Sequence, residues 1–201
     1  LLELPWILDA DITVKPLYGH QEGAKLGYNP QKPGRPSHTY HTYMIANLRL
    51  VLEVEVQAGN KAHSNHSLPG LMALLNRLPA NCKPEFVRGD IGYGTDKMMK
   101  ELEAISQHYL FKLKRSKYVQ ELIHKHHCLG EWTVVRKDWE AKESSIKLMG
   151  WEKERRVVIV RRRLPQESMT AVEYNVAGQQ EMSFVDDPED MKIISRLIKN
   201  E

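Results

Sequence analysis

The stretch Trp6-Ile7-Leu8-Asp9-Ala10-Asp11-Ile12-Thr13-Val14 decides how the fold begins. Apolar and β-branched residues form a short run flanked by prolines, a pattern that favours a buried strand over a helix. Asp9 and Asp11, two residues apart, share one face of that strand. Asp11 is the better candidate metal ligand because it lies near the strand's end and precedes Thr13, whose hydroxyl can fix the neighbouring backbone. The alternative is that both acids are solvated or cap the strand end.

A second acidic residue follows another apolar run, in Phe86-Val87-Arg88-Gly89-Asp90-Ile91-Gly92-Tyr93-Gly94. Phe86 and Val87 predict a short buried strand that delivers Asp90 to a glycine-rich turn before a helix, a common place for reactive groups in α/β sheets. Carboxylates from two strand ends can share divalent cations, as in many enzymes that cut or join phosphodiesters. The alternative for Asp90 is an ordinary turn.

The segments between and after these acids predict the rest of a mixed sheet. Residues 39–56 favour two strands with a tight turn at Asn47, and their alternation places Glu53 and Glu55 on the outer surface. Ser67 and Thr95 are suited to cap two helices, and a strand is expected at 109–113. The order strand, hairpin, helix, strand, helix, strand predicts a mixed α/β sheet covered by helices.

Residues 18–36 are rich in glycine and proline, which predicts an ordered loop or a short flap. The loop and its flank carry four cations past Asp11: Lys15, Lys25, Lys32 and Arg35.

Beyond Lys117, we expect an inserted β-rich region with a helix at 118–127 and strands at 132–136, 145–148 and 155–163. The predicted division is a core over residues 1–117, an insertion over 118–165 and an acidic tail over 166–201. Residues 112–163 hold 15 Lys or Arg against 7 Asp or Glu, while residues 164–201 hold 3 against 8. The basic block is suited to nucleic acid, although a solvated mixed-charge surface is the alternative.

Composition excludes several classes of protein. The chain has 201 residues, a formal net charge of +3 and no apolar run near the roughly 20 residues of a membrane helix. With no secretion signal in view, we expect a cytoplasmic protein without membrane contact. Two cysteines without a short spacing support neither a disulfide framework nor a zinc ribbon.

Histidine and tryptophan clusters have simpler explanations than a special site. His124, His126 and His127 suggest zinc, but Lys125 lies among them and no second ligand group follows. The same ambiguity holds for the pair at 63 and 66. The tryptophans favour core packing over base stacking, since no repeated aromatic motif accompanies them: Trp6, Trp132, Trp139 and Trp151.

Three stretches together resemble bacterial insertion-sequence transposases with a DDE catalytic domain. They are Leu8-Asp9-Ala10-Asp11-Ile12-Thr13-Val14-Lys15-Pro16-Leu17-Tyr18-Gly19-His20-Gln21-Glu22-Gly23-Ala24 with Gly27-Tyr28-Asn29-Pro30, then Arg88-Gly89-Asp90-Ile91-Gly92-Tyr93, then Tyr109-Leu110-Phe111-Lys112. The resemblance spans most of residues 5–165. It implies an RNase H-like fold, a mixed sheet flanked by helices, with a β-rich insertion before the last catalytic element.

The resemblance also implies a function, two-metal cleavage and strand transfer in DNA transposition. The family's first two carboxylates fall on Asp11 and Asp90, which would bind Mg²⁺ or Mn²⁺, and the partner would be DNA at transposon ends and target, with a homodimer in the intact family member. The expected DNA contacts are Lys15, Lys25, Lys32, Arg35, Arg88, Arg161 and Arg163.

One family element is not found. The family places a glutamate on a helix after the insertion, with Tyr, Arg and Lys companions, and Glu181, Glu189 and Glu201 lack them, so no third carboxylate is assigned. We expect the N-terminal DNA-binding segment and the C-terminal catalytic helix to be missing, and the chain alone to be inactive. The alternatives are a DNA-binding remnant acting through residues 112–163 and a decayed transposase copy.

Overall fold

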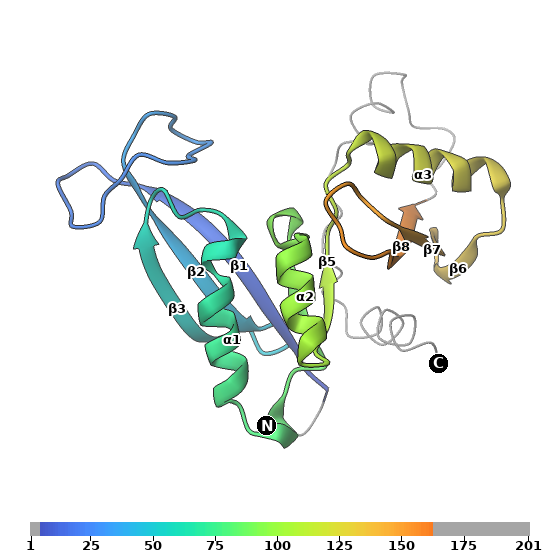
Figure 1. Ribbon diagram of the computed structural model, residues 1–201, viewed down its shortest axis with the longest axis horizontal. Coiled ribbons are helices and arrows are strands. Elements are labelled where there is room, and N and C mark those ends of the chain that lie inside the picture. The colour runs from blue at the N-terminus through green and yellow to red at the C-terminus, as the bar shows by residue number, and fades with distance from the viewer. Residues whose placement is uncertain (1–4, 163–201) are drawn as a thin grey trace. The chain divides into compact units, whose positions relative to one another are not determined.

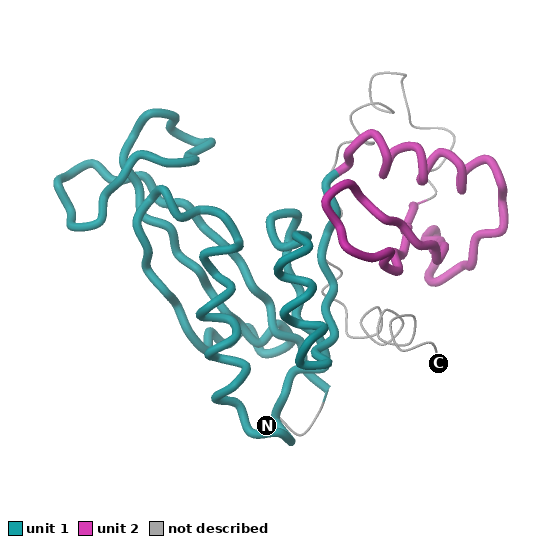
Figure 2. Tube along the Cα trace, viewed as in Figure 1, with its two compact units in different colours: residues 1–114 teal, residues 115–201 magenta. Residues whose placement is uncertain are grey.

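The computed structural model describes residues 5–162. The chain divides into two compact units, residues 1–114 and 115–201 (Figure 2). The predicted boundaries at 117 and 165 stay predictions. The acidic tail, Arg163 and the expected loss of a C-terminal helix all fall outside the described residues.

The first unit is built on a five-stranded mixed sheet with the order β3-β2-β1-β4-β5 (Figure 1). Its strands are β1 (Ile7–Pro16), β2 (Ser37–Ile45), β3 (Leu50–Ala58), β4 (Phe86–Gly89) and β5 (His108–Phe111). β1, β2 and β3 pair antiparallel, whereas β4 lies parallel to both β1 and β5. This arrangement confirms the predicted mixed α/β, RNase H-like fold.

Two helices cover one face of this sheet, α1 (Leu68–Arg77) and α2 (Asp96–Ala104). The face is set by the period of two along β1, whose Leu8 and Ala10 are buried with Leu71 of α1 and Leu102 of α2. Each fully buried leucine side chain contributes about 1.5–3 kcal/mol by leaving water. The opposite face of β1 carries Asp9 and Asp11.

The two predicted helix starts differ in outcome. Thr95 caps α2 as expected, because its Oγ1 accepts a hydrogen bond from the Met98 amide at 3.3 Å. Ser67 precedes α1 and Pro69 lies in its first turn, but the Ser67 side chain makes no capping bond. The Ser67 hydroxyl instead contacts His41.

The expected outer position of two glutamates is wrong. Glu53 and Glu55 are half-buried on the side of α1, where Glu53 pairs with Arg77, while Val54 and Val56 are 47% and 57% exposed. β3 is an edge strand, and its register with β2 shifts beside Tyr43 and Met44. Glu53 and Glu55 lie opposite Tyr43 and His41 of β2, whose side chains are fully buried, so the register places both glutamates on the covered face.

The second unit combines α3 (Lys117–Leu129) with a three-stranded antiparallel sheet of β6 (Thr133–Arg136), β7 (Trp139–Ile146) and β8 (Arg155–Arg162). The helix and the outer strands agree with the prediction. The middle strand was expected at 145–148, which is wrong, because pairing from Trp139↔Arg162 to Ile146↔Arg155 makes a strand of residues with weak strand propensity. None of the helices in the described range combines the length and apolar character of a membrane span.

Candidate functional site

The register of the parallel β1–β4 pair brings Asp11 and Asp90 together. The ladder runs from Ile7↔Phe86 to Ala10↔Gly89, so the next residues are Asp11, which lies within β1, and Asp90, which directly follows β4. Paired strands lie about 4.8 Å apart. Both aspartates are exposed. Two carboxylates 79 positions apart in sequence therefore lie side by side where the β1–β4 pairing ends. The sequence placed Asp11 near the end of its strand, which is wrong, because Asp11 lies in the middle of β1, which continues to Pro16 through its pairing with β2.

Their common neighbour is Tyr93, which is fully buried. Burial first, and also the nearby charges of Asp11 and Asp90, raise the pKa of the Tyr93 phenol. Glu55 has the same effect on this phenol, so Tyr93 lies near all three carboxylates.

Each of these carboxylates has one local hydrogen bond. Asp11 Oδ2 accepts from the Thr13 hydroxyl at 2.9 Å, and Asp90 Oδ1 accepts from the Gly92 amide at 2.9 Å. Thr13 thus fixes the Asp11 side chain, where the sequence suggested a contact with backbone. Among residues 5–162, the second oxygen of each carboxylate has no hydrogen-bond partner, which leaves it able to bind a cation.

Asp9 is engaged elsewhere, by Arg88 on β4. Arg88 Nε donates to Asp9 Oδ1 and Nη2 donates to Oδ2, both at 2.5 Å. The two side chains are 5% and 19% exposed. Arg88 was expected to contact DNA, but this burial and pairing make it unsuited to reach a phosphate, and we do not retain that role.

The donor set suits a hard divalent cation only in part. Carboxylate oxygens are the ligands that Mg²⁺ and Mn²⁺ prefer. Over the described residues, no cluster of three or more His, Cys, Asp or Glu side chains could hold a metal ion. Asp11 and Asp90 fit as two ligands of such a site.

The loop between β1 and β2 carries exposed cations around an exposed tyrosine. Tyr18 is 68% exposed, with the Arg35 guanidinium 4.4 Å and the Lys32 ammonium 5.3 Å from its ring centroid. A hydrogen bond from Lys32 lowers the Tyr18 pKa. Lys15 and Lys25 are also exposed. The sequence indicated these cations but not Tyr18, whose signal is its place among them.

The same loop is held to the sheet. Leu17 donates to Pro36 O at 2.9 Å, and Lys25 pairs with Ser37. A Cβ on Gly27 would lie 2.0 Å from Gly59 O, so only glycine allows this approach of two backbones. These contacts tie the loop to the sheet, and the choice between an ordered loop and a short flap stays a prediction.

Arg161 of the second unit is tied to its own neighbours. Its guanidinium donates to Glu140 at 2.7 Å and lies 4.0 Å from the ring centroid of Trp132. Glu140 is 2% exposed, so the pair also compensates a buried charge. Arg161 therefore has a structural role that the sequence did not indicate.

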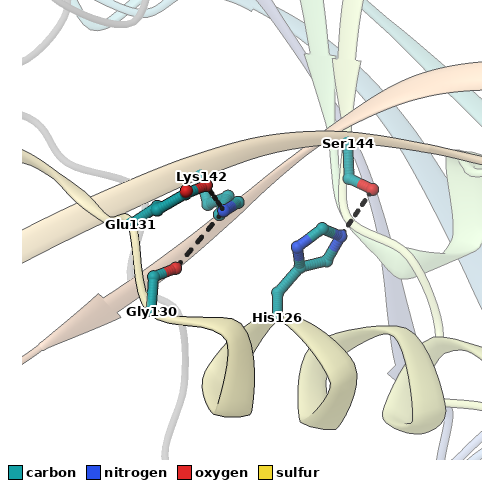
Figure 3. A network of polar contacts seen from close by, with 5 residues as sticks. All are labelled: His126, Gly130, Glu131, Lys142 and Ser144. Carbon is teal, nitrogen blue, oxygen red and sulfur yellow. Dashed lines mark hydrogen bonds and ion pairs between the residues drawn. The ribbon is translucent and has the colours of Figure 1, made fainter.

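The histidines of α3 turn to different partners. His126 Nε2 lies 2.8 Å from Ser144 Oγ, and nearby Lys142 donates to Gly130 O and Glu131 (Figure 3). His127 Nδ1 lies 3.1 Å from Arg161 Nη1. These contacts link α3 to the sheet of the second unit.

Comparison with known proteins identifies the family to which the chain belongs. The family model described as transposase DDE domain group 1 matches residues 4–186. Similar solved structures include a simian T-cell lymphotropic virus intasome in complex with PP2A regulatory subunit B56 gamma, at 12% identity and TM-score 0.33, covering 61% of this chain and 41% of that chain. Another is a piggyBac transposase synaptic complex with hairpin DNA, at 11% identity and TM-score 0.41, covering 83% of this chain and 35% of that chain.

The chain spans less than half the length of both solved chains. The search of curated proteins finds no match. The family model nevertheless covers most of the sequence, including both acidic stretches. The chain belongs to the DDE transposase family, as a member of transposase DDE domain group 1.

Proposed function

We propose that this chain is the catalytic core of a DNA transposase, in which Asp11 and Asp90 hold divalent metal for phosphodiester cleavage and strand transfer. The observation that carries the proposal is the register of β1 and β4, which makes Asp11 and Asp90 neighbours where the pairing of these two strands ends. Bound Mg²⁺ or Mn²⁺ would activate a water or a DNA 3′-hydroxyl and stabilise charge on the attacked phosphate.

The chain's own residues prepare this site before any ligand arrives. Thr13 and the Gly92 amide each hold one carboxylate oxygen and so limit the rotation of Asp11 and Asp90. The Asp9–Arg88 pair, two positions earlier on the same strands, locks the register that keeps the two carboxylates adjacent. Such preorganisation lowers the cost of binding a cation.

DNA would contact the cations around the loop. Lys15 lies on the same face of β1 as Asp11, and Lys25, Lys32 and Arg35 are exposed on the segment that follows. These residues suit phosphate contacts, which release counterions and make binding salt-dependent. We favour this loop over Arg161, which is engaged with Glu140.

We propose that the chain alone has little strand-transfer activity, because two carboxylates coordinate a metal pair weakly. Among the described residues no third carboxylate joins Asp11 and Asp90. This favours a second candidate function, that of a DNA-binding remnant without catalysis. The remnant would bind DNA with steep salt dependence that persists in chelator, whereas binding by the catalytic core would strengthen with Mn²⁺. The homodimer and the cytoplasmic location stay predictions.

The decisive experiment measures Mn²⁺ binding to the purified chain by electron paramagnetic resonance. Asp11→Asn and Asp90→Asn should each weaken binding by at least about tenfold, as expected for loss of a metal ligand. Asp138→Asn is the matched control, because Asp138 is exposed in the turn between β6 and β7 and Asn tolerates its positive φ of 65°. Unchanged Mn²⁺ binding in both Asp11→Asn and Asp90→Asn would contradict the assignment of these residues as metal ligands.

A further inference from the structure

A buried chain of hydrogen bonds runs from the turn after Asp90 into the interior of the first unit. The Tyr93 hydroxyl donates to Ser67 Oγ at 3.2 Å, and Ser67 Oγ lies 2.5 Å from His41 Nδ1. His41 Nε2 lies 3.1 Å from the Lys61 carbonyl oxygen. Tyr93, Ser67 and His41 are all fully buried. These hydrogen bonds connect three elements: β2, the start of α1 and the turn after β4.

The direction of each bond in this chain is determined. The Lys61 carbonyl can only accept, so His41 Nε2 carries the proton and Nδ1 accepts from the Ser67 hydroxyl. The Ser67 oxygen remains free to accept from Tyr93. This assignment requires a neutral His41, in agreement with its pKa, which burial lowers. It also explains why the Ser67 side chain does not cap α1.

Tyr93 is in turn coupled to Asp90 through the turn Ile91–Tyr93. The Tyr93 amide donates to Asp90 O at 3.1 Å, and Gly92 donates to Asp90 Oδ1. The Tyr93 ring lies directly against Gly89, where a Cβ would meet Tyr93 Cγ at 2.7 Å. The Tyr93 ring thus packs against Gly89, the residue before Asp90, while the Tyr93 amide is hydrogen-bonded to the Asp90 carbonyl oxygen.

We propose that Tyr93 is a positioning residue for Asp90, held in place by Ser67 and His41. The phenol anchors the turn to the interior, and the turn orients the Asp90 carboxylate through the Gly92 amide. The importance of this role for metal binding rests on the proposed function, whereas the orientation of Asp90 does not. Only the hydroxyl of Tyr93 reaches Ser67, so loss of one oxygen atom should loosen the turn.

The test compares Tyr93→Phe with Tyr43→Phe. Tyr43 is a matched control because it is fully buried and its hydroxyl also donates to Ser67, but to the backbone oxygen at 2.8 Å. That oxygen keeps a second donor, the Leu71 amide at 2.9 Å. Both variants lose one buried hydroxyl from the same region, but only Tyr93→Phe releases the turn. Ser67→Ala removes the acceptor and provides a second variant.

The first readout is amide exchange at Gly92 and Tyr93, measured by NMR without metal. Tyr93→Phe and Ser67→Ala should accelerate it severalfold, and Tyr43→Phe should leave it near the wild-type rate. Equal acceleration in Tyr93→Phe and Tyr43→Phe, or none in Tyr93→Phe, would overturn the proposal.

The second readout is Mn²⁺ affinity. Tyr93→Phe should weaken it by up to about tenfold, the lower end for partners that orient a metal ligand. An Asp90→Asn variant separates the two proposals. If Asp90→Asn leaves Mn²⁺ affinity unchanged while Tyr93→Phe still accelerates Gly92 exchange, the metal function fails and the positioning of Asp90 stands.

Discussion

Arg88 binds Asp9 with two hydrogen bonds across the parallel strands β1 and β4, two positions before Asp11 and Asp90. Removing Asp9 takes two hydrogen bonds and a paired charge from the buried Arg88 guanidinium. Asp9→Ala should therefore lower the free energy of unfolding by about 3 kcal/mol, measured by urea denaturation. Replacing both residues, as in Asp9→Leu with Arg88→Met, should recover most of that loss. A loss below about 1 kcal/mol in Asp9→Ala would mean that the pair is screened like a surface salt bridge.

Lys32 and Arg35 flank an exposed tyrosine and have no role in the core. If both contact phosphate, Lys32→Ala and Arg35→Ala should each reduce the slope of log K against log salt by about 1. The measurement is fluorescence anisotropy of a labelled duplex over a salt series.

Arg161→Ala provides the contrast, because Arg161 is bound to Glu140 and Trp132. It should destabilise the second unit and leave the salt slope unchanged. If Arg161→Ala reduced the salt slope equally, DNA would contact the second unit, and the assignment of the DNA contact to the loop would be contradicted.

Much of the fold could be predicted because its signals are local. Prolines delimit β1, Thr95 caps α2, and short apolar runs mark β4 and β5. Asp11 and Asp90 could be singled out for the same reason, since each adjoins a short apolar run, although Asp11 lies inside β1 and only Asp90 follows its strand. Their adjacency depends on the parallel pairing of β1 and β4. The family resemblance implied a mixed sheet, but no local pattern indicates the register of that pair.

The errors concern contacts between distant residues. The Asp9–Arg88 pair joins positions 79 apart, and no local pattern indicates that an arginine beside Asp90 turns inward. Glu53 faces the helix because it lies opposite the buried Tyr43 of β2, a register that alternation along one strand cannot reveal. Ser67 looked like a cap because the sequence gives no sign that His41 and Tyr93 would compete for its hydroxyl.

His41 makes the stability of the first unit depend on pH. Burial, the largest cause, lowers the His41 pKa below the ordinary 6.5. The hydrogen bond to the Lys61 backbone acts in the opposite direction, and the charges of His66 and Lys61 add smaller lowering effects. Below about pH 6.5 the unfolded chain therefore binds a proton that the folded chain does not, and stability falls until the pH reaches the folded-state pKa. Urea denaturation at pH 7.5 and 5.5 should show this loss.

A His41→Gln variant isolates the contribution of the histidine, because carboxylates titrate alike in both proteins. The drop in the free energy of unfolding between the two pH values should be smaller in His41→Gln than in the wild type. The same drop in both would show that His41 protonates as readily in the folded chain as in the unfolded one.

Gly89 directly precedes Asp90 and packs against the buried Tyr93 ring, so it connects the core to the candidate site. An added Cβ would lie 2.7 Å from Tyr93 Cγ and 2.8 Å from Tyr93 Cβ, atoms that cannot move without shifting the turn after Asp90. Gly89→Ala should therefore cost about 2 kcal/mol of unfolding free energy, as overpacked cores do, and should weaken Mn²⁺ binding. Calorimetry and metal titration on the same variant give both values.

Gly34→Ala is the control for Gly89→Ala, because it lies at a φ of +77° with nothing within 4 Å of the added Cβ. It should cost only the backbone strain, about 1 kcal/mol, and leave metal affinity unchanged. Steric conflict with the ring also predicts coupling, so Gly89→Ala should cost less in a Tyr93→Ala background. Additive costs would mean that the methyl group is accommodated without moving Tyr93, and the orientation of Asp90 would then depend on the Gly92 amide alone.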